Sequence, residues 1–251
     1  MNPPNPAPTP VRPHLLRRTL AEFIGTGLLV AIVVGSGIMA QRLSPDDVGL
    51  QLLQNSLTTA LGLAVLILVL GPVSGAHFNP VVSFVDWWVN RGTPHGLPLR
   101  NLLPYLVAQI VGGTAGTVLA GAMFDTEPAL STTDRASAGT VLGEVVATAG
   151  LILVIFALAR SGKSAVTAAA AGAYIGAAYW FTSSTSFANP AVTIARMFTD
   201  TFAGIAPASV GPFLLAELLG ATIGLGLVLV LYPTPARSTP AAVAPHPAAQ
   251  L

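Results

Sequence analysis

Six long apolar stretches constrain this 251-residue chain more than any other feature of its sequence. They run over roughly residues 20–40, 50–70, 101–123, 140–159, 165–182 and 211–231. A helix that crosses the hydrocarbon core of a bilayer needs about 20 such residues. With 53% hydrophobic and only 8% charged residues, the chain cannot be an ordinary soluble domain. We therefore predict an all-α membrane protein with six transmembrane helices.

The basic residues predict how these helices are oriented. Six spans put both termini and the even-numbered connections on one side of the membrane. That side carries eight Lys and Arg residues and the other side three, namely Arg42, Arg135 and Arg196. Cytoplasmic segments are enriched in Lys and Arg. We therefore expect a multi-pass protein of the cell (inner) membrane with both termini in the cytoplasm.

An internal repeat divides the chain into two halves. The run SGAHFNPVVS at residues 74–83 matches STSFANPAVT at residues 184–193, so Asn79-Pro80 and Asn189-Pro190 are 110 residues apart. A glutamate also recurs early in the first and fourth spans, as Glu22 and Glu144. Each half has three spans, an odd number, so the two copies cross the membrane in opposite senses. The sequence therefore predicts an inverted repeat.

This repeat predicts the domain organisation. We expect one domain over residues 18–232, with halves at about 18–123 and 139–232. The flanking segments 1–17 and 233–251 are rich in proline and poor in bulky apolar residues, which is typical of disordered tails. The opening segment also lacks the apolar stretch and cleavage site of a removable secretion signal.

Each Asn-Pro pair precedes an apolar run that is too short to cross a membrane. Proline suits the first position of a helix, and asparagine is a favoured cap just before it. We therefore predict two re-entrant half-helices, starting at Pro80 and Pro190 near the middle of the membrane. Their N-termini would direct positive dipole ends at a central pore, where the amides of Asn79 and Asn189 donate to a passing solute and cations are repelled.

These motifs resemble the aquaporins and aquaglyceroporins, as do AEFIGTG, YLVAQIVGGTAG and FLLAELLGATIG in the first, third and sixth spans. The resemblance covers nearly all of residues 18–232. It implies a bundle of six helices and two half-helices, assembled as a homotetramer with one pore in each subunit. Val81 departs mildly from the family's usual alanine. The implied pore motif consists of Asn79, Pro80, Val81, Asn189, Pro190 and Ala191.

The resemblance also implies a selectivity filter, and here the chain departs from the family pattern. In the family an arginine directly follows the second Asn-Pro-Ala, whereas this chain has Val192. Counting back from the asparagines as the family does gives Thr59, Ala177 and Ser186 for the other three positions, with a one-residue ambiguity for Ala177. None of these residues is aromatic. We therefore expect a filter wider than that of a water channel.

Four residues near the expected pore have two interpretations each. Arg196 lines an outer vestibule, or it contacts lipid headgroups or Asp200 at the helix end. His77 lines or gates the cytoplasmic mouth, or it is fixed by hydrogen bonds and shapes the loop. Glu22 and Glu144 brace the backbone before each half-helix, which we favour, or they relay protons in a coupled transporter.

The expected function is passive conduction of small neutral solutes across the bilayer. The run SFANPAVTIARMFTDTFAGIAP at residues 186–207 resembles a bacterial subgroup linked with arsenic resistance, which implies arsenous acid, methylated arsenicals and other polyol-like solutes. A glycerol or water channel is the first alternative, and an ion-coupled secondary transporter is a weaker one. With no cysteine, a net charge of +1 and no nucleotide-binding loop, we expect no enzyme activity, catalytic residue, metal, cofactor or nucleic-acid partner.

Overall fold

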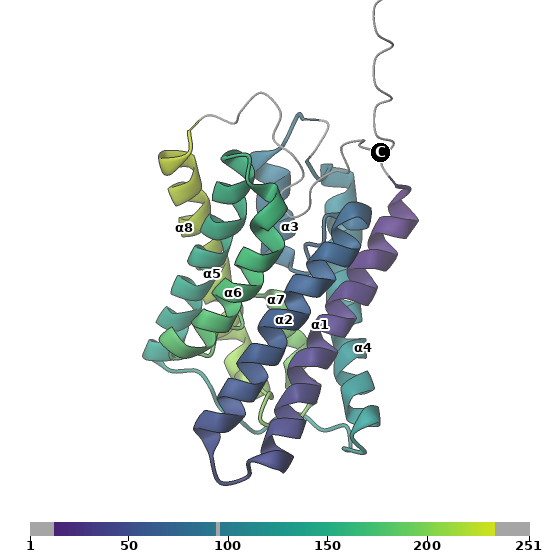
Figure 1. Cartoon of the computed structure of the whole chain (residues 1–251), viewed down its shortest axis with the longest axis vertical. Coiled ribbons are helices and arrows are strands. Elements are labelled where there is room, and N and C mark those ends of the chain that lie inside the picture. The colour runs from purple at the N-terminus through teal and green to yellow at the C-terminus, as the bar shows by residue number, and fades with distance from the viewer. Residues whose placement is uncertain (1–12, 94–95, 234–251) are drawn as a thin grey trace, which may run out of the picture.

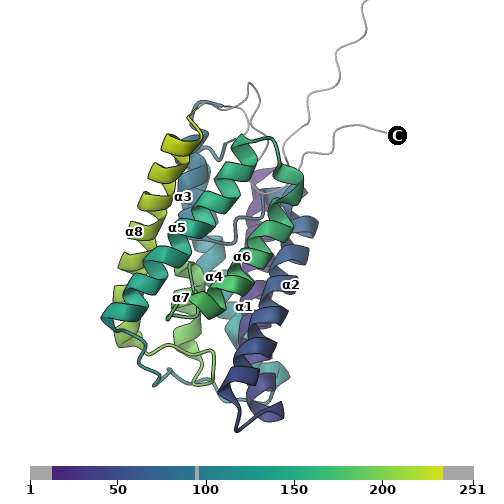
Figure 2. The same cartoon turned by 60° about the vertical axis from the view of Figure 1, so that its left-hand side comes forward.

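The computed structural model describes residues 13–93 and 96–233. These residues form helices and connecting loops without a strand. Figures 1 and 2 show one elongated bundle in which the long helices run roughly along the same axis. The elements are α1 (Leu15–Leu43), α2 (Val48–Ser74), α3 (Pro80–Val89), α4 (Leu99–Met123), α5 (Ala138–Arg160), η1 (Ser164–Val166), α6 (Thr167–Phe181), α7 (Pro190–Ala195), η2 (Arg196–Phe198) and α8 (Pro207–Leu231).

The long helices fit a bilayer. In hydrocarbon every backbone N–H and C=O must be paired within the protein, and a helix satisfies this within one segment. Five helices, α1, α2, α4, α5 and α8, have the length and apolar character of membrane spans. α6 has 15 residues and follows the short η1. Many large apolar side chains, such as Leu61 and Leu215, point outward on the bundle surface, as lipid contact requires.

The two halves of the chain pack in the same way. α1 lies against α2 and α4, α5 lies against α6 and α8, and α2 contacts α6 across the halves. Glycines bring the paired helices close together. A Cβ atom at Gly116 of α4 would overlap the carbonyl oxygen of Gly27 in α1, and one at Gly224 of α8 would lie 2.6 Å from the carbonyl oxygen of Ala149 in α5. These contacts match the small-residue packing of membrane helices.

The predicted half-helices are confirmed. The side-chain oxygen of Asn79 accepts a hydrogen bond from the Val81 amide at 3.1 Å and caps α3, and Asn189 caps α7 through the Ala191 amide at 3.0 Å. Both helices begin inside the bundle and run toward opposite ends of it (Figure 1). We call the end where α1 begins and α8 ends the terminal face, at the top of Figure 1, and the other end the distal face. α3 runs to the terminal face and α7 to the distal face.

The domain boundaries differ slightly from those expected. α1 begins at Leu15, ahead of the predicted start at residue 18, and α8 ends at Leu231. The predicted disordered tails lie almost entirely outside the described residues, so their character stays a prediction.

Candidate functional site

The two half-helices meet at the centre of the bundle, and each asparagine binds the loop of the other half. The side-chain amide of Asn79 donates to the carbonyl oxygen of Ala188 at 2.8 Å. The side-chain amide of Asn189 donates to the carbonyl oxygen of Phe78, also at 2.8 Å. Since each amide group has two N–H bonds, one remains for a solute after this contact. Both asparagines line the central cavity.

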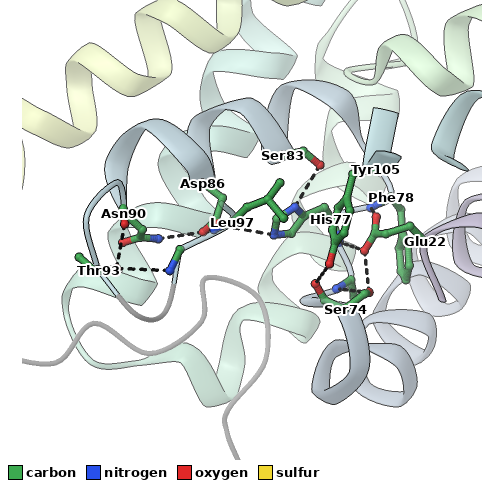
Figure 3. Close-up of polar contacts among 12 residues, drawn as sticks. Glu22, Ser74, His77, Phe78, Ser83, Asp86, Asn90, Thr93, Leu97 and Tyr105 are labelled. Carbon is green, nitrogen blue, oxygen red and sulfur yellow. Dashed lines mark hydrogen bonds and ion pairs between the residues drawn. The ribbon is translucent and has the colours of Figure 1, made fainter. Parts of the chain in front are cut away.

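Buried glutamates hold the loops that lead into the half-helices. The carboxylate of Glu22 accepts from the amides of His77 at 3.0 Å and Phe78 at 2.7 Å, as Figure 3 shows. Glu144 accepts in the same way from the amides of Phe187 at 2.8 Å and Ala188 at 2.7 Å. These are the contacts that the bracing interpretation requires, and every carboxylate oxygen of the two residues is used by the backbone.

These glutamates stabilise a backbone that is otherwise unfavourable. Phe78 has φ of 50° and Ala188 has φ of 48°, in the left-handed region that costs L-residues energy. Positive φ also recurs at the matching pairs Gly75 and Thr185, and Ala76 and Ser186. The sequence repeat is therefore also a repeat of backbone conformation.

A cavity runs past the asparagines along the axis of the bundle. Polar groups on its wall include the amides of Asn79 and Asn189 and the side chain of His77 at its terminal end. The rest of the wall is mainly aliphatic. Of the expected pore motif, Pro80, Val81, Pro190 and Ala191 do not line the cavity but build the half-helices behind it. The aliphatic lining includes Leu29, Val33, Leu63, Leu151, Ile155 and Ile175.

Three of the four expected filter residues line this cavity, and the fourth needs a correction. Thr59, Ser186 and Val192 are buried on its wall. Ala177 is exposed on the outside of α6 and does not reach it. The face of α6 that lines the cavity instead presents Tyr179, because residues two apart on a helix lie on nearly opposite sides.

Tyr179 changes the expected character of the filter. Its hydroxyl lies 3.2 Å from the hydroxyl of Thr59, so the two residues connect α6 to α2 across the cavity wall. Phe187 also lines the cavity. Aromatic side chains therefore face the cavity beside the four counted positions, none of which is itself aromatic. Counting back along the sequence missed Tyr179 because Ala177 lies between Ile175 and Tyr179, which face the cavity one turn apart.

Arg196 lies at the distal end of the cavity. It is buried, with 2% of its surface exposed. Its Nε donates to the carbonyl oxygen of Ala203, and its guanidinium carbon is 3.5 Å from the centroid of the Phe187 ring. Asp200, the partner considered from the sequence, instead accepts from the backbone amide of Thr132 at 2.9 Å. The structure thus places Arg196 at the pore and not at the lipid surface.

His77 lines the cavity and is also held by polar contacts, whereas its gating role stays a prediction. It lines the cavity, and its Nδ1 lies 3.0 Å from the hydroxyl of Ser83. Its Nε2 lies 3.8 Å from Asp86, which also accepts from the amide of Leu97 at 2.8 Å (Figure 3). A buried network therefore fixes His77 at the terminal end of the cavity.

Comparison with known proteins agrees with this architecture. The family model "Major intrinsic protein" matches residues 10–188. The chain is 50% identical over 215 residues to "Aquaglyceroporin AqpS" of Rhizobium meliloti, covering 85% of this chain and 89% of the relative. It is 29% identical to "Aquaporin Z" of Brucella melitensis, covering 84% of this chain and 95% of the relative. The solved aquaglyceroporin of Plasmodium falciparum has the same fold, with a TM-score of 0.63 over 88% of this chain and 98% of that one, at 21% identity. The chain therefore belongs to the major intrinsic protein family and is a passive multi-pass membrane channel, not an enzyme.

Proposed function

We propose that this channel conducts small uncharged solutes larger than water, with arsenous acid and methylated arsenicals as its principal solutes. The observation that carries the proposal is Val192. It lines the cavity in the first turn of α7, directly after Asn189-Pro190-Ala191, where the family's filter arginine would stand. The side chain of valine is shorter than that of arginine and has no hydrogen-bond donor. The level of Val192 therefore admits bulkier and less polar solutes.

The wall around Val192 favours the same solutes. Leu151, Ile155 and Ile175 line the cavity with Val192, and Thr59 and the two asparagines supply polar groups. A neutral solute with hydroxyl groups exchanges some of its bound water for hydrogen bonds to these polar groups. Any methyl groups that it carries contact the aliphatic wall. An ion has no such compensation for lost hydration. These properties suit neutral hydroxylated and methylated molecules.

Glycerol is the second candidate solute. It is favoured by the 50% identity to a protein named an aquaglyceroporin, and by a wall that combines aliphatic and hydroxyl groups. Glycerol and arsenous acid each present three hydroxyls to a channel, so one pore can pass both.

Two further properties belong to this proposal. We infer a homotetramer with one pore in each subunit, supported by the resemblance to the family and by the exposed apolar side chains on the bundle surface. We also infer an inner-membrane location with the terminal face in the cytoplasm. The excess of Lys and Arg on the terminal side supports this orientation.

The test is solute uptake by reconstituted proteoliposomes, with water, glycerol and arsenous acid compared by light scattering and direct uptake. We expect rapid arsenous acid and glycerol flux in the unaltered channel and at least a roughly tenfold loss in Val192→Arg, because a long charged side chain then enters the aliphatic chamber. Val192→Leu adds bulk without charge and is the matched control.

Three results would contradict the proposal. Water flux without arsenous acid or glycerol flux removes the wide-filter assignment. Arsenous acid flux unchanged in Val192→Arg shows that Val192 does not set the filter. Accumulation of solute against its gradient, driven by an ion gradient, indicates a coupled transporter.

A further inference from the structure

Arg196 occupies a junction between two cavities. The central cavity ends at this residue, and a vestibule opens beyond it on the distal face. Among the described residues, Arg196 is the only one that lines both spaces. We call the second space the distal vestibule; its wall includes Asn55, Thr133, Arg135, Thr185 and Asp200. A solute that passes between the two spaces must pass Arg196.

The surrounding structure holds Arg196 in one position. Its Nε donates to the carbonyl oxygen of Ala203, and its own carbonyl oxygen accepts from the amide of Ile205 at 3.3 Å. One face of the guanidinium lies on the ring of Phe187. Phe187 is itself fixed, because its amide donates to Glu144 at 2.8 Å and its ring packs edge-on against Phe213 at 5.2 Å between centroids. The guanidinium is therefore preorganised by the loop before α8 and by the loop before α7.

No carboxylate neutralises Arg196 through an ion pair within the part of the chain that the structure describes. Asp200 is bound by the amide and hydroxyl of Thr132. Arg135, the other cation of the vestibule, lies 5.5 Å from the Phe187 centroid and donates to the carbonyl oxygens of Gly204 and Phe202. Two cations thus stand beside the same aromatic ring. Arg196 interacts electrostatically with the buried carboxylate of Glu144, and its charge faces both the central cavity and the distal vestibule.

The position of Arg196 differs from that of a filter arginine directly after Asn-Pro-Ala. It is four residues beyond Val192, on the same side of the half-helix and about 6 Å further along its axis. Val192, Tyr179 and Thr59 line the central cavity, and Arg196 alone among the described residues also lines the distal vestibule. The charge of Arg196 and the level of Val192 are therefore separated along the pore.

We propose that Arg196, seated on Phe187, is the specificity-determining residue of this channel's distal constriction, one helical turn outside the usual filter level. There it repels cations and donates hydrogen bonds to the oxygens of neutral hydroxylated solutes as they enter. This inference rests on the proposed channel function and assigns two kinds of selection to two levels of the pore. The aliphatic wall at Val192 admits large solutes, and Arg196 excludes positively charged ones.

The test measures ion leak and solute flux in the same proteoliposomes. Proton entry is followed with an internal pH-sensitive dye under a K⁺ diffusion potential, and arsenous acid and glycerol uptake are measured in parallel. The unaltered channel should leak no more protons than protein-free vesicles. In Arg196→Ala we expect proton leak to rise roughly tenfold or more, because a fixed unit charge within several ångströms of the path is removed. Neutral solute flux should persist in Arg196→Ala because the aliphatic wall at Val192 is intact, but its rate should change because entering solutes lose the hydrogen-bond donors of the guanidinium.

Two further variants separate the barrier from a general effect on folding. The double variant Val192→Arg with Arg196→Ala places an arginine one helical turn closer to Asn189. It should restore a low proton leak and reduce arsenous acid flux. Arg135→Gln removes the neighbouring vestibule cation, which does not line the central cavity, and should change proton leak less than Arg196→Ala.

The outcomes are distinguishable from those of the proposed function. Proton leak unchanged in Arg196→Ala, with solute flux retained, overturns this inference and leaves the channel assignment in place. A leak that the returned arginine at residue 192 fails to suppress also overturns it. Absence of neutral solute flux in the unaltered protein contradicts the proposed function instead.

Discussion

Asn79 and Asn189 are bound to each other's loops. Each side-chain oxygen caps its own half-helix, and each side-chain amide donates at 2.8 Å to a carbonyl of the opposite loop, Ala188 for Asn79 and Phe78 for Asn189. One residue type thus provides a helix cap and a link between the two halves while it lines the central cavity. Serine provides only the cap. This difference allows the roles to be separated by mutation.

Replacement of Asn189 by alanine removes both the cap and the link between the loops. We expect a loss of about 2 kcal/mol in stability, from about 1 kcal/mol for the cap and a similar amount for the hydrogen bond. Asn189→Ser keeps a capping oxygen and should lose only about half as much. Thermal unfolding in detergent measures both values. Equal destabilisation by the two substitutions would show that the cap contributes little.

Glu144 is expected to be intolerant even of glutamine. Its two carboxylate oxygens accept from the amides of Phe187 and Ala188. Glutamine has one acceptor oxygen and an NH₂ group, so one buried backbone N–H is left unpaired at a cost of about 1–3 kcal/mol. The lower melting temperature should be accompanied by reduced solute flux, because this loop positions Phe187 and Asn189. Full stability and flux in Glu144→Gln would argue against bracing by Glu144.

Two glycines in α8 form a matched pair for a packing test. A Cβ atom at Gly224 would lie 2.6 Å from the carbonyl oxygen of Ala149 in α5, whereas one at Gly226 meets nothing within 4 Å. Gly224→Ala should therefore destabilise the protein by about 1–3 kcal/mol through forced separation of the helices. Gly226→Ala should be neutral or slightly stabilising, since alanine favours a helix. Similar melting temperatures for the two variants would contradict close packing at Gly224.

Two tyrosines in α6 test the wall of the pore. Tyr179→Phe removes the contact with Thr59 across the cavity wall, and we expect glycerol uptake to rise because the wall at this level is less tightly held. Tyr174 is the control. Its hydroxyl donates to the carbonyl oxygen of Val146 at 3.3 Å, and it does not line the cavity. Tyr174→Phe should leave uptake unchanged. A smaller or equal glycerol flux in Tyr179→Phe would show that this contact does not set the width.

Much of the fold follows from the sequence alone. The apolar stretches predicted the helices because lipid leaves few other ways to pair the backbone. The repeated Asn-Pro pairs predicted the half-helices because capping and the first helical turn are local properties of those residues. The matching glutamates and glycines indicated which positions brace loops and which bring helices together. Each of these predictions depends on residues that are close in sequence or equivalent in the repeat.

Tertiary structure decided which side chains form the distal end of the pore. Sequence counting assigned Ala177 to the filter, but the packing of α6 turns Ala177 outward and places Tyr179 on the cavity wall. The sequence left Arg196 between the pore and the lipid. Its place at the pore depends on Phe187 and Ala203, which come from two loops that meet only in the folded protein. Because such contacts join segments whose spacing varies with loop length, only the packed structure determines them.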